Sequence, residues 1–281
     1  MDYGILYLVA TPIGNLGDIS ARALEVLESV DLIAAEDTRR TVQLLNHFGI
    51  SKPLTSYHEH NKREKGQYII SLLKQGKNVA QVSDAGTPAI SDPGEDLVGL
   101  CIENDITVTS VPGPVAGINA LILSGLNTRR FAFEGFLSVN KRHRHEHLSS
   151  VKNDTHTLIF YEAPHKLRTT LEDMRDAFGG GRRIALVREL TKLHEEVIRT
   201  DIDGAIEKYK EVSPRGEYVL VVEGAKEDAG EEEKPWAGLS ASEHVEKYIS
   251  EGMSSKEAIK RTAVDRGVPK REIYNEYHLK Q

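Results

Sequence analysis

Short apolar runs alternate with stretches of helical periodicity through the first four-fifths of the chain. Apolar runs bounded by glycine, proline or polar residues are typical of buried strands, and a period near 3.6 is typical of helices. Strands are predicted at residues 5–10, 32–36, 79–83, 107–111, 131–136, 157–161, 184–188 and 218–223. Helices are predicted at residues 19–30, 95–104, 115–123, 164–178 and 201–209. The alternation predicts a mainly α/β architecture.

A stiff segment at residues 112–114, Pro-Gly-Pro, separates two groups of predicted strands. Each proline fixes its own φ and restricts the residue before it. We therefore predict two α/β domains, at residues 1–113 and 114–224.

The remaining residues differ in character from these domains. Residues 225–235 are densely charged and are predicted to be a linker. Residues 236–281 are predicted to form a C-terminal helical extension, with a capping box from Ser254 to Glu257 and a turn at residues 267–269. This layout is typical of a helix-turn-helix, and a helical hairpin that only packs on the body is an equal alternative.

The composition of the 281 residues, 39% hydrophobic and 28% charged, is that of a soluble globular protein. No apolar run approaches the roughly 20 residues of a membrane helix, and the N-terminus lacks the pattern of a signal peptide. A single cysteine, Cys101, fits a reducing compartment and excludes an internal disulfide. We therefore expect a cytoplasmic protein without a membrane partner.

The formal net charge of −7 argues against a generally basic nucleic-acid binder. Residues 129–147 are nevertheless strongly basic, which indicates either a solvated surface loop or a local contact to nucleic acid. Histidines alternate with other residues at 58–60 and 143–147, but neither segment matches a known zinc pattern. A metal site is therefore not predicted.

Four polar segments follow predicted strands. At residues 11–18 a glycine-containing turn precedes a helix capped by Asp18 or Ser20, which favours either a bound anion or a tight turn without a ligand. At residues 36–40 two carboxylates and two guanidiniums follow a probable parallel strand. Ligands usually bind at that edge of an open α/β sheet, although acidic residues at a helix start would give the same pattern.

The segment at residues 82–94 contains two Asp, two Pro and two Gly after a buried strand. Such a rigid polar loop suits a small charged ligand: Asp84 could face a cationic group or a hydroxyl, and Gly86 leaves room for the ligand. In residues 188–196, Glu189, Lys192 and Glu195 are acid–base candidates, with a solvated charged loop as the alternative.

Several segments in order, spanning residues 5 to about 223, resemble one family. They are LVATPIGNLGDISARALEVL, DLIAAEDTRR, VSDAGTPAISDPG, VPGPVAGINAL, FYEAPHKL, RELTKLHEE and RGEYVLVVEG, together with the basic residues 141–144. The chain resembles the tetrapyrrole methylase superfamily of methyltransferases that use S-adenosyl-L-methionine. Thr11-Pro12-Ile13 replaces the fuller glycine-rich first loop of the tetrapyrrole enzymes, which favours the RNA-modifying branch.

The resemblance implies two α/β domains with the cofactor in the cleft between them, and usually a homodimer. It also implies a set of cofactor-binding residues: Pro12, Gly14, Asp84, Ala85, Gly86, Thr87, Ala89, Val115, Ala116, Tyr161 and Leu190. The implied reaction is 2′-O-methylation of a cytidine, number 1402 in the usual numbering, of 16S ribosomal RNA in the small ribosomal subunit.

Methyl transfer to a ribose hydroxyl is an in-line displacement, so the protein must position the oxygen and accept its proton. We predict Glu36, Asp37 or Glu189 as the base, and Arg39 or Lys192 as the group that stabilises the alkoxide or holds a phosphate. The C-terminal helices are predicted to contact RNA. Five single residues are predicted to do so as well: Lys62, Arg63, Lys141, Arg142 and Arg144.

Two alternatives stay open at this point. One is a methyltransferase of the same fold that acts on a small molecule or a protein. The other is a non-catalytic RNA-binding factor of ribosome assembly. A nicotinamide dehydrogenase is disfavoured because the dinucleotide fingerprint glycines are missing.

Overall fold

The computed structural model describes residues 3–226, 236 and 238–278. Contacts divide the chain after Ala225 into a larger unit and a C-terminal unit. The predicted linker lies outside the described residues except for its first two positions. No helix of the described ranges is long and apolar enough to cross a membrane.

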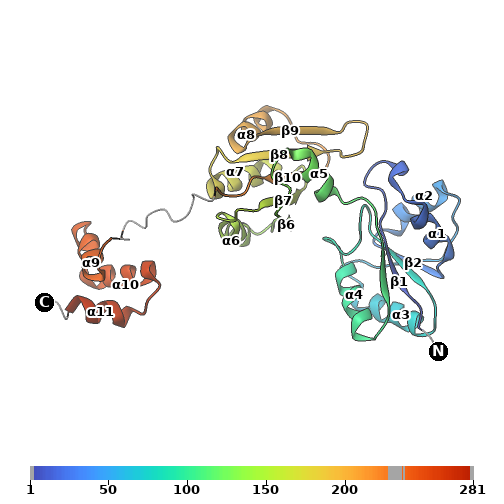
Figure 1. Ribbon diagram of the computed structural model, residues 1–281, viewed down its shortest axis with the longest axis horizontal. Helices are drawn as coiled ribbons and strands as arrows, with labels where there is room; N and C mark the ends of the chain where they lie inside the picture. The colour runs from blue at the N-terminus through green and yellow to red at the C-terminus, as the bar shows by residue number, and fades with distance from the viewer. Residues whose placement is uncertain (1–2, 227–235, 237, 279–281) are drawn as a thin grey trace. The chain divides into compact units, whose positions relative to one another are not determined.

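The first sheet of the larger unit is wholly parallel, with the strand order β3-β2-β4-β1-β5. Its strands are β1 (Leu6–Val9), β2 (Leu32–Ala35), β3 (Leu54–Ser56), β4 (Val79–Val82) and β5 (Val108–Val111). Apolar side chains of α1 (Ala21–Ser29) and α2 (Thr38–His47) cover one face. Those of α3 (Lys62–Lys74) and α4 (Gly94–Glu103) cover the other (Figure 1). Because the strands are parallel, the polar segments that follow them meet at one edge.

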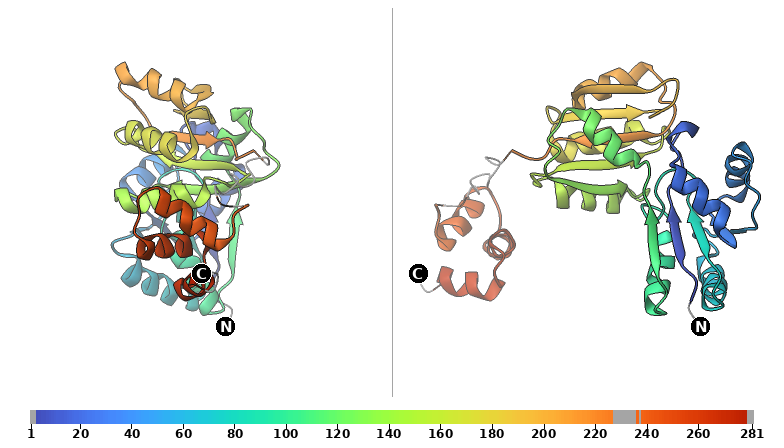
Figure 2. Two further views of the ribbon diagram at one scale, coloured as in Figure 1. Left: turned by 90° about the vertical axis from the view of Figure 1, so that its left-hand side faces the viewer. Right: turned by 45° about the vertical axis from the view of Figure 1, so that its right-hand side comes forward.

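The second sheet is mixed, with the order β6-β7-β10-β8-β9. Its strands are β6 (Phe131–Phe136), β7 (Thr157–Glu162), β8 (Arg183–Arg188), β9 (Glu196–Asp201) and β10 (Tyr218–Val222). Three helices, α6 (Lys141–Val151), α7 (Leu167–Phe178) and α8 (Ile202–Glu211), bury their apolar residues against one face. The short helix α5 (Ala116–Ser124) packs on the other (Figure 2).

In the described part of the C-terminal unit there are three helices, α9 (Ala241–Ser250), α10 (Ser255–Arg266) and α11 (Lys270–His278). They pack around a small core that includes Val245, Ile259 and Ile273. The predicted capping box at Ser254 is confirmed, and Ser240 with Glu243 forms a second one. A left-handed glycine, Gly267, ends α10.

All eight predicted strands are present, and the predicted α/β architecture is confirmed. The sequence pattern missed β3, β9, α2, α3, α6 and the 3-10 turn η1 (Leu16–Asp18). β3 has three half-buried residues, too few to show a period. In α6 only Arg144 and Leu148 are buried, so the helix carries almost no apolar stripe. The loop interpretation of residues 129–147 is wrong, because most of them form β6 and α6.

Candidate functional site

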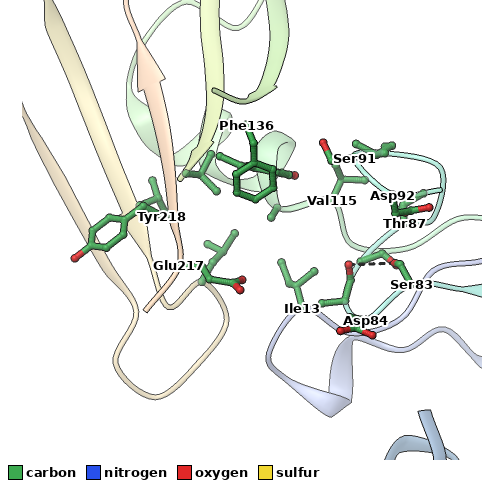
Figure 3. A pocket seen from close by; sticks show the side chains of 18 of the residues that line it. Ile13, Ser83, Asp84, Thr87, Ser91, Asp92, Val115, Phe136, Glu217 and Tyr218 are labelled. Carbon is green, nitrogen blue, oxygen red and sulfur yellow. Dashed lines mark hydrogen bonds between the residues drawn. The ribbon is translucent and has the colours of Figure 1, made fainter. Parts of the chain in front are cut away.

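A cavity of about 310 Å³ lies where the carboxyl ends of the first sheet face the second sheet. One wall comes from segments that follow β1, β2, β4 and β5. The other wall comes from the ends of β6, β7 and β8 and the start of β10. Figure 3 shows Ile13 and Asp84 on the first side and Phe136 and Glu217 on the second. The volume lies in the range of small-molecule sites.

The loop after β4 is tied to the end of β1 by paired backbone hydrogen bonds. Thr11 N donates to Gly86 O at 2.9 Å, and Gly86 N donates to Thr11 O at 3.0 Å. Gly86 has a φ of 86°, and a Cβ there would lie 3.2 Å from Ile13 Cγ2. Thr87 Oγ1 donates to Pro114 O at 3.0 Å. Glycine is therefore required at 86 both for its backbone conformation and for the close approach of Ile13.

Asp84 joins the loop after β4 to the start of α2. Its Oδ1 accepts from Asp37 N at 3.0 Å, and its Oδ2 lies 2.9 Å from Arg40 Nη1. Asp92 holds the far end of the loop by accepting from Ala89 N and Gly94 N through Oδ1. Its Oδ2 is buried without a hydrogen-bond partner. This wall therefore presents one buried carboxylate oxygen whose hydrogen bonding is incomplete.

The second wall is largely aromatic and aliphatic. Tyr161 Oη accepts from Gly117 N in the first turn of α5 at 3.0 Å. The rings of Phe133 and Phe136 meet the Tyr161 ring edge-on, with centroids 5.0 and 5.5 Å away. Burial raises the pKa of Tyr161, which keeps its hydroxyl neutral. Val187, Leu190 and Val219 complete this apolar side.

Backbone strain is concentrated beside the cavity. Among the described residues, five non-glycine positions have positive φ. Ala89, Ser91, Glu189 and Thr191, with φ between 51° and 68°, belong to the loops that form the two walls. Each such conformation costs of order 1–3 kcal/mol and is typical of ligand-binding segments. The strain supports a functional rather than a purely connecting role for both loops.

The lining is strongly acidic. Two cations, Arg40 and Lys192, accompany six carboxylates, which are Glu36, Asp84, Asp92, Glu162, Glu189 and Glu217. Burial and the neighbouring charge of Asp84 raise the pKa of Glu36, and Asp92 adds to this. Burial also raises the pKa of Asp92. A cationic ligand would relieve this accumulation of negative charge.

Most residues predicted to bind the cofactor line the cavity. They are Asp84, Ala85, Gly86, Thr87, Val115, Ala116, Tyr161 and Leu190. Pro12, Gly14 and Ala89 do not line the cavity, and their assignment to the cofactor stays a prediction. Gly14 is packed beneath the loop after β8, because a Cβ there would lie 2.6 Å from Lys192 Cγ. Ile13 occupies the wall position between Pro12 and Gly14.

The residues predicted for catalysis separate into two groups. Glu36, Glu189 and Lys192 line the cavity, whereas Asp37 and Arg39 do not. Asp37 caps α2 and pairs with Arg39 at 2.7 Å, and this contact lowers the pKa of Asp37 to about 2. Its carboxylate is thus already paired outside the cavity lining. The geometry favours Glu36, Glu189 and Lys192 over Asp37 and Arg39 for the predicted catalytic roles.

The residues predicted to contact RNA differ in their exposure and in whether they form ion pairs with carboxylates of the protein. Lys141, Arg142 and Arg63 are exposed, and Arg142 pairs with Glu146 one turn along α6. Lys62 lies between Glu59 and Asp96.

Arg144 differs from the other residues predicted to contact RNA, because its charge is already paired inside the fold. Its side chain is 11% exposed and pairs with Asp173 at 2.5 Å. It also donates to Ser138 O and Val139 O.

Several lining residues were not among the individually predicted site residues, although some lie in the segments predicted to bind a ligand. They are Ile13, Arg40, Ser83, Ile90, Ser91, Asp92, Phe136, Glu162, Val187, Glu217, Tyr218 and Val219. Glu36 and Arg40 both belong to the charged segment that follows β2, with Glu36 before α2 and Arg40 in its first turn. Phe136 and Glu217 stand at the ends of strands that the sequence predicts. The sequence shows where these residues lie along the chain, but it does not show that the two sheets face each other and bring the residues into one cavity.

Fold and site together define an α/β enzyme with an acidic small-molecule cavity at a sheet edge. Residues 5–205 match the Tetrapyrrole (Corrin/Porphyrin) Methylases, and the chain belongs to this family. The resemblance drawn from the sequence is thus confirmed, and the chain is a methyltransferase.

Several curated relatives carry the name "Ribosomal RNA small subunit methyltransferase I". The Bacillus subtilis protein is 53% identical over 281 residues, covering 100% of this chain and 96% of the relative. That of Synechocystis is 46% identical, covering 96% of each chain. That of Escherichia coli O157:H7 is 44% identical, covering 99% of this chain and 96% of the relative.

Solved structures share the fold at low sequence identity. A uroporphyrin-III-C-methyltransferase from Thermus thermophilus has a TM-score of 0.57 at 20% identity, covering 78% of this chain and 94% of its own. A diphthine synthase has a TM-score of 0.59 at 14% identity, covering 78% and 90%. These likenesses support the two-sheet architecture alone.

Proposed function

We propose that this chain transfers a methyl group from S-adenosylmethionine to the ribose 2′-oxygen of a cytidine in 16S ribosomal RNA, the cytidine 1402 that the sequence resemblance implies. The names of the relatives support the ribosomal substrate. The observation that carries the proposal is the acidic cavity with Glu36 in its wall.

The cavity suits S-adenosylmethionine by charge and by shape. The cofactor carries a sulfonium and an ammonium group, and the lining has six carboxylates against two cations. Asp84 and the buried, unpartnered Oδ2 of Asp92 would hold the cationic groups, and Gly86 leaves the loop backbone open to the ligand. The apolar side around Tyr161 and Leu190 would hold the less polar parts. When bound, the cofactor supplies an electrophilic methyl group.

Glu36 is the residue that we propose as the general base. A ribose hydroxyl must lose its proton as the oxygen attacks, and a carboxylate with a raised pKa accepts that proton more readily than an ordinary one. Glu189 also lines the cavity but is already paired with Lys192 at 3.1 Å. Lys192 lies on the opposite wall from Glu36. We assign to it the electrostatic stabilisation of the ribose 2′-oxygen as that oxygen loses its proton.

The acceptor atom can be tested with two RNA fragments of identical sequence. One contains the target cytidine and the other contains 2′-deoxycytidine at that position alone. We expect labelled methyl to be transferred to the first fragment and not to the second. Equal labelling of both fragments would move the reaction to a base atom, and labelling of neither, with cofactor binding intact, would move the substrate to a small molecule or a protein.

We also propose that the chain acts as a homodimer in the cytoplasm. α5 is rich in apolar residues, and Ile118 and Ile122 in it are 41% and 64% exposed. Phe131 and Phe133 on the edge strand β6 are each 40% exposed. Exposed apolar side chains that cluster in this way mark interaction surfaces. Light scattering should give twice the chain mass for the wild type and one chain mass for Ile122→Lys; an unchanged mass would exclude this surface as the interface.

A further inference from the structure

Arg40 lines the cavity, but it is neither the proposed base nor one of the residues proposed to hold the cofactor. It lies in the first turn of α2, four residues after Glu36, and its side chain is 66% exposed. Nη1 lies 2.9 Å from Asp84 Oδ2. The guanidinium is thus a largely exposed group of the cavity lining, and its charge acts on Glu36, the residue that we propose as the base.

The acidity of the cavity creates a difficulty for an RNA acceptor. Six lining carboxylates suit a cationic cofactor but repel the phosphates on both sides of a ribose. Among the lining residues that the structure describes, only Arg40 and Lys192 can offset this repulsion. Lys192 belongs to the opposite wall and pairs with Glu189 there. Arg40 is thus the cation on the Glu36 side.

The contact between Arg40 and Asp84 can exchange at little cost. Ion pairs as exposed as this one contribute little to stability. A phosphate offers the planar guanidinium a two-pronged contact of the same kind. Asp84 would keep its hydrogen bond from Asp37 N, so the start of α2 stays fixed when Arg40 turns away.

We propose that Arg40 is the binding site for a phosphodiester next to the acceptor ribose, and that it leaves Asp84 for this phosphate when RNA binds. The inference rests on the proposed function in one respect, namely that the acceptor is RNA. It adds a binding residue for the backbone of the acceptor, distinct from the residues that would hold the cofactor.

The neighbouring Arg39 provides a matched control. It carries the same charge one position earlier and is 87% exposed. Its guanidinium pairs with Asp37 outside the cavity lining. Arg39→Gln and Arg40→Gln thus remove the same charge from the same turn of one helix, and only the second removes it from the cavity.

The charge of Arg40 also predicts a pH signature. Glu36 faces Asp84 after β4, Asp92 before α4 and Arg40 on α2. The charges of Asp84 and Asp92 raise the pKa of Glu36, whereas a backbone hydrogen bond at Asp84 and the charge of Arg40 lower it. Removing the guanidinium should therefore move the acidic limb of the kcat profile to higher pH. Arg39→Gln should leave that limb in place. This shift reports the charge of Arg40 near Glu36, and the RNA affinity with its salt dependence reports the phosphate contact.

The experiment compares the wild type, Arg40→Gln, Arg40→Lys and Arg39→Gln on unmodified small ribosomal subunits and on a labelled 16S RNA fragment. For Arg40→Gln we expect the KM for subunits and the Kd for RNA to rise about tenfold, as for loss of one charged contact. The slope of log K against log salt should fall by about one. Arg40→Lys should recover part of the affinity. Arg39→Gln should stay within about twofold of the wild type. The Kd for S-adenosylmethionine should not rise in any variant, because loss of a lining cation does not weaken the binding of a cationic cofactor.

Two results would overturn the inference. Equal RNA affinity and salt dependence for Arg40→Gln and Arg39→Gln would show that the cavity position has no phosphate to hold. A loss of cofactor affinity in Arg40→Gln as large as the loss of RNA affinity would assign Arg40 to the cofactor. The RNA-binding measurement does not require methyl transfer. Failure of the wild type to methylate RNA would therefore count against the proposed function, while the RNA affinities of the Arg40 and Arg39 variants could still be compared.

Discussion

The starts of α2 and α6 look alike in sequence, since each places two arginines beside acidic or histidine residues, yet their arginines have different environments. At α2, Arg40 lines the cavity and keeps its charge exposed. At α6, Arg144 turns inward and is neutralised by Asp173 on α7. Position in the fold accounts for the difference: α2 follows a parallel strand at the ligand-binding edge, whereas α6 packs on the outer face of the second sheet.

The comparison shows that clustered charge predicts a function poorly until the partners of each charge are known. A guanidinium that pairs with a buried carboxylate, as Arg144 does with Asp173, stabilises the fold and is not available to a ligand. A guanidinium that is itself mostly exposed, as Arg40 is, stays available to a ligand. Mutations at these two helix starts should therefore affect different properties, activity at α2 and stability at α6.

The largest effect is expected from Glu36→Gln. Removal of a general base typically lowers kcat by about 10²- to 10⁴-fold. Because glutamine keeps the shape, the Kd for S-adenosylmethionine should change little. Asp37→Asn, one residue on and outside the cavity, is the control and should retain most of the activity. Equal kcat for Glu36→Gln and the wild type in single-turnover assays would assign the base elsewhere, with Glu189 as the next candidate.

Arg144→Met should give the largest loss of stability. The change leaves the Asp173 carboxylate buried without its main partner, and breaking a buried pair in this way costs about 3–5 kcal/mol. Urea unfolding followed by circular dichroism measures the loss. The double variant Arg144→Met with Asp173→Leu should recover much of it, because no uncompensated charge remains. A single variant as stable as the wild type would mean that this pair does not hold α6 to α7.

The same pair predicts a loss of stability in acid. Burial alone would raise the pKa of Asp173, but hydrogen bonds from Arg144 and His145 outweigh burial and hold the pKa below its usual value. A carboxyl with a lowered pKa stabilises the fold fully above its unfolded value of about 3.9, and this contribution fades as the pH falls through the folded pKa. The difference in unfolding free energy between the wild type and Asp173→Asn should therefore shrink from pH 7 to pH 3. A constant difference would contradict the ion pair.

The smallest effect is expected from Arg142→Gln. This side chain is 83% exposed, and its pair with Glu146 along α6 is of the kind that contributes about 0.3–0.5 kcal/mol. Stability should hardly change, while RNA affinity should fall slightly with a salt slope lower by about one. An unchanged salt slope would remove α6 from the RNA-contacting surface.

Much of the fold was readable in the sequence because its strands are short, apolar and bounded by polar turns. The elements that the sequence pattern did not predict, such as β3 and α6, have few buried residues and hence no clear hydrophobic periodicity. The loop after β4 was recognisable as a ligand loop because Asp, Pro and Gly are concentrated there beyond what a connection needs.

The rest of the site depends on contacts between segments far apart in the chain. Phe136 and Glu217 reach the cavity only because the second sheet faces the first, and no local pattern records this. Likewise, the choice of Arg40 over Arg39 depends on whether Asp84 or Asp37 is within reach. Distinguishing paired from available charges requires three-dimensional positions.

The most direct test of the account is transfer of labelled methyl from S-adenosylmethionine to small ribosomal subunits that lack the modification, and to naked 16S RNA, with the modified nucleoside identified by mass spectrometry. The account predicts 2′-O-methylcytidine with the wild type and its loss with Glu36→Gln. Labelled cytidine methylated on the base, or no labelled nucleoside in either RNA while the protein binds the cofactor, would contradict it.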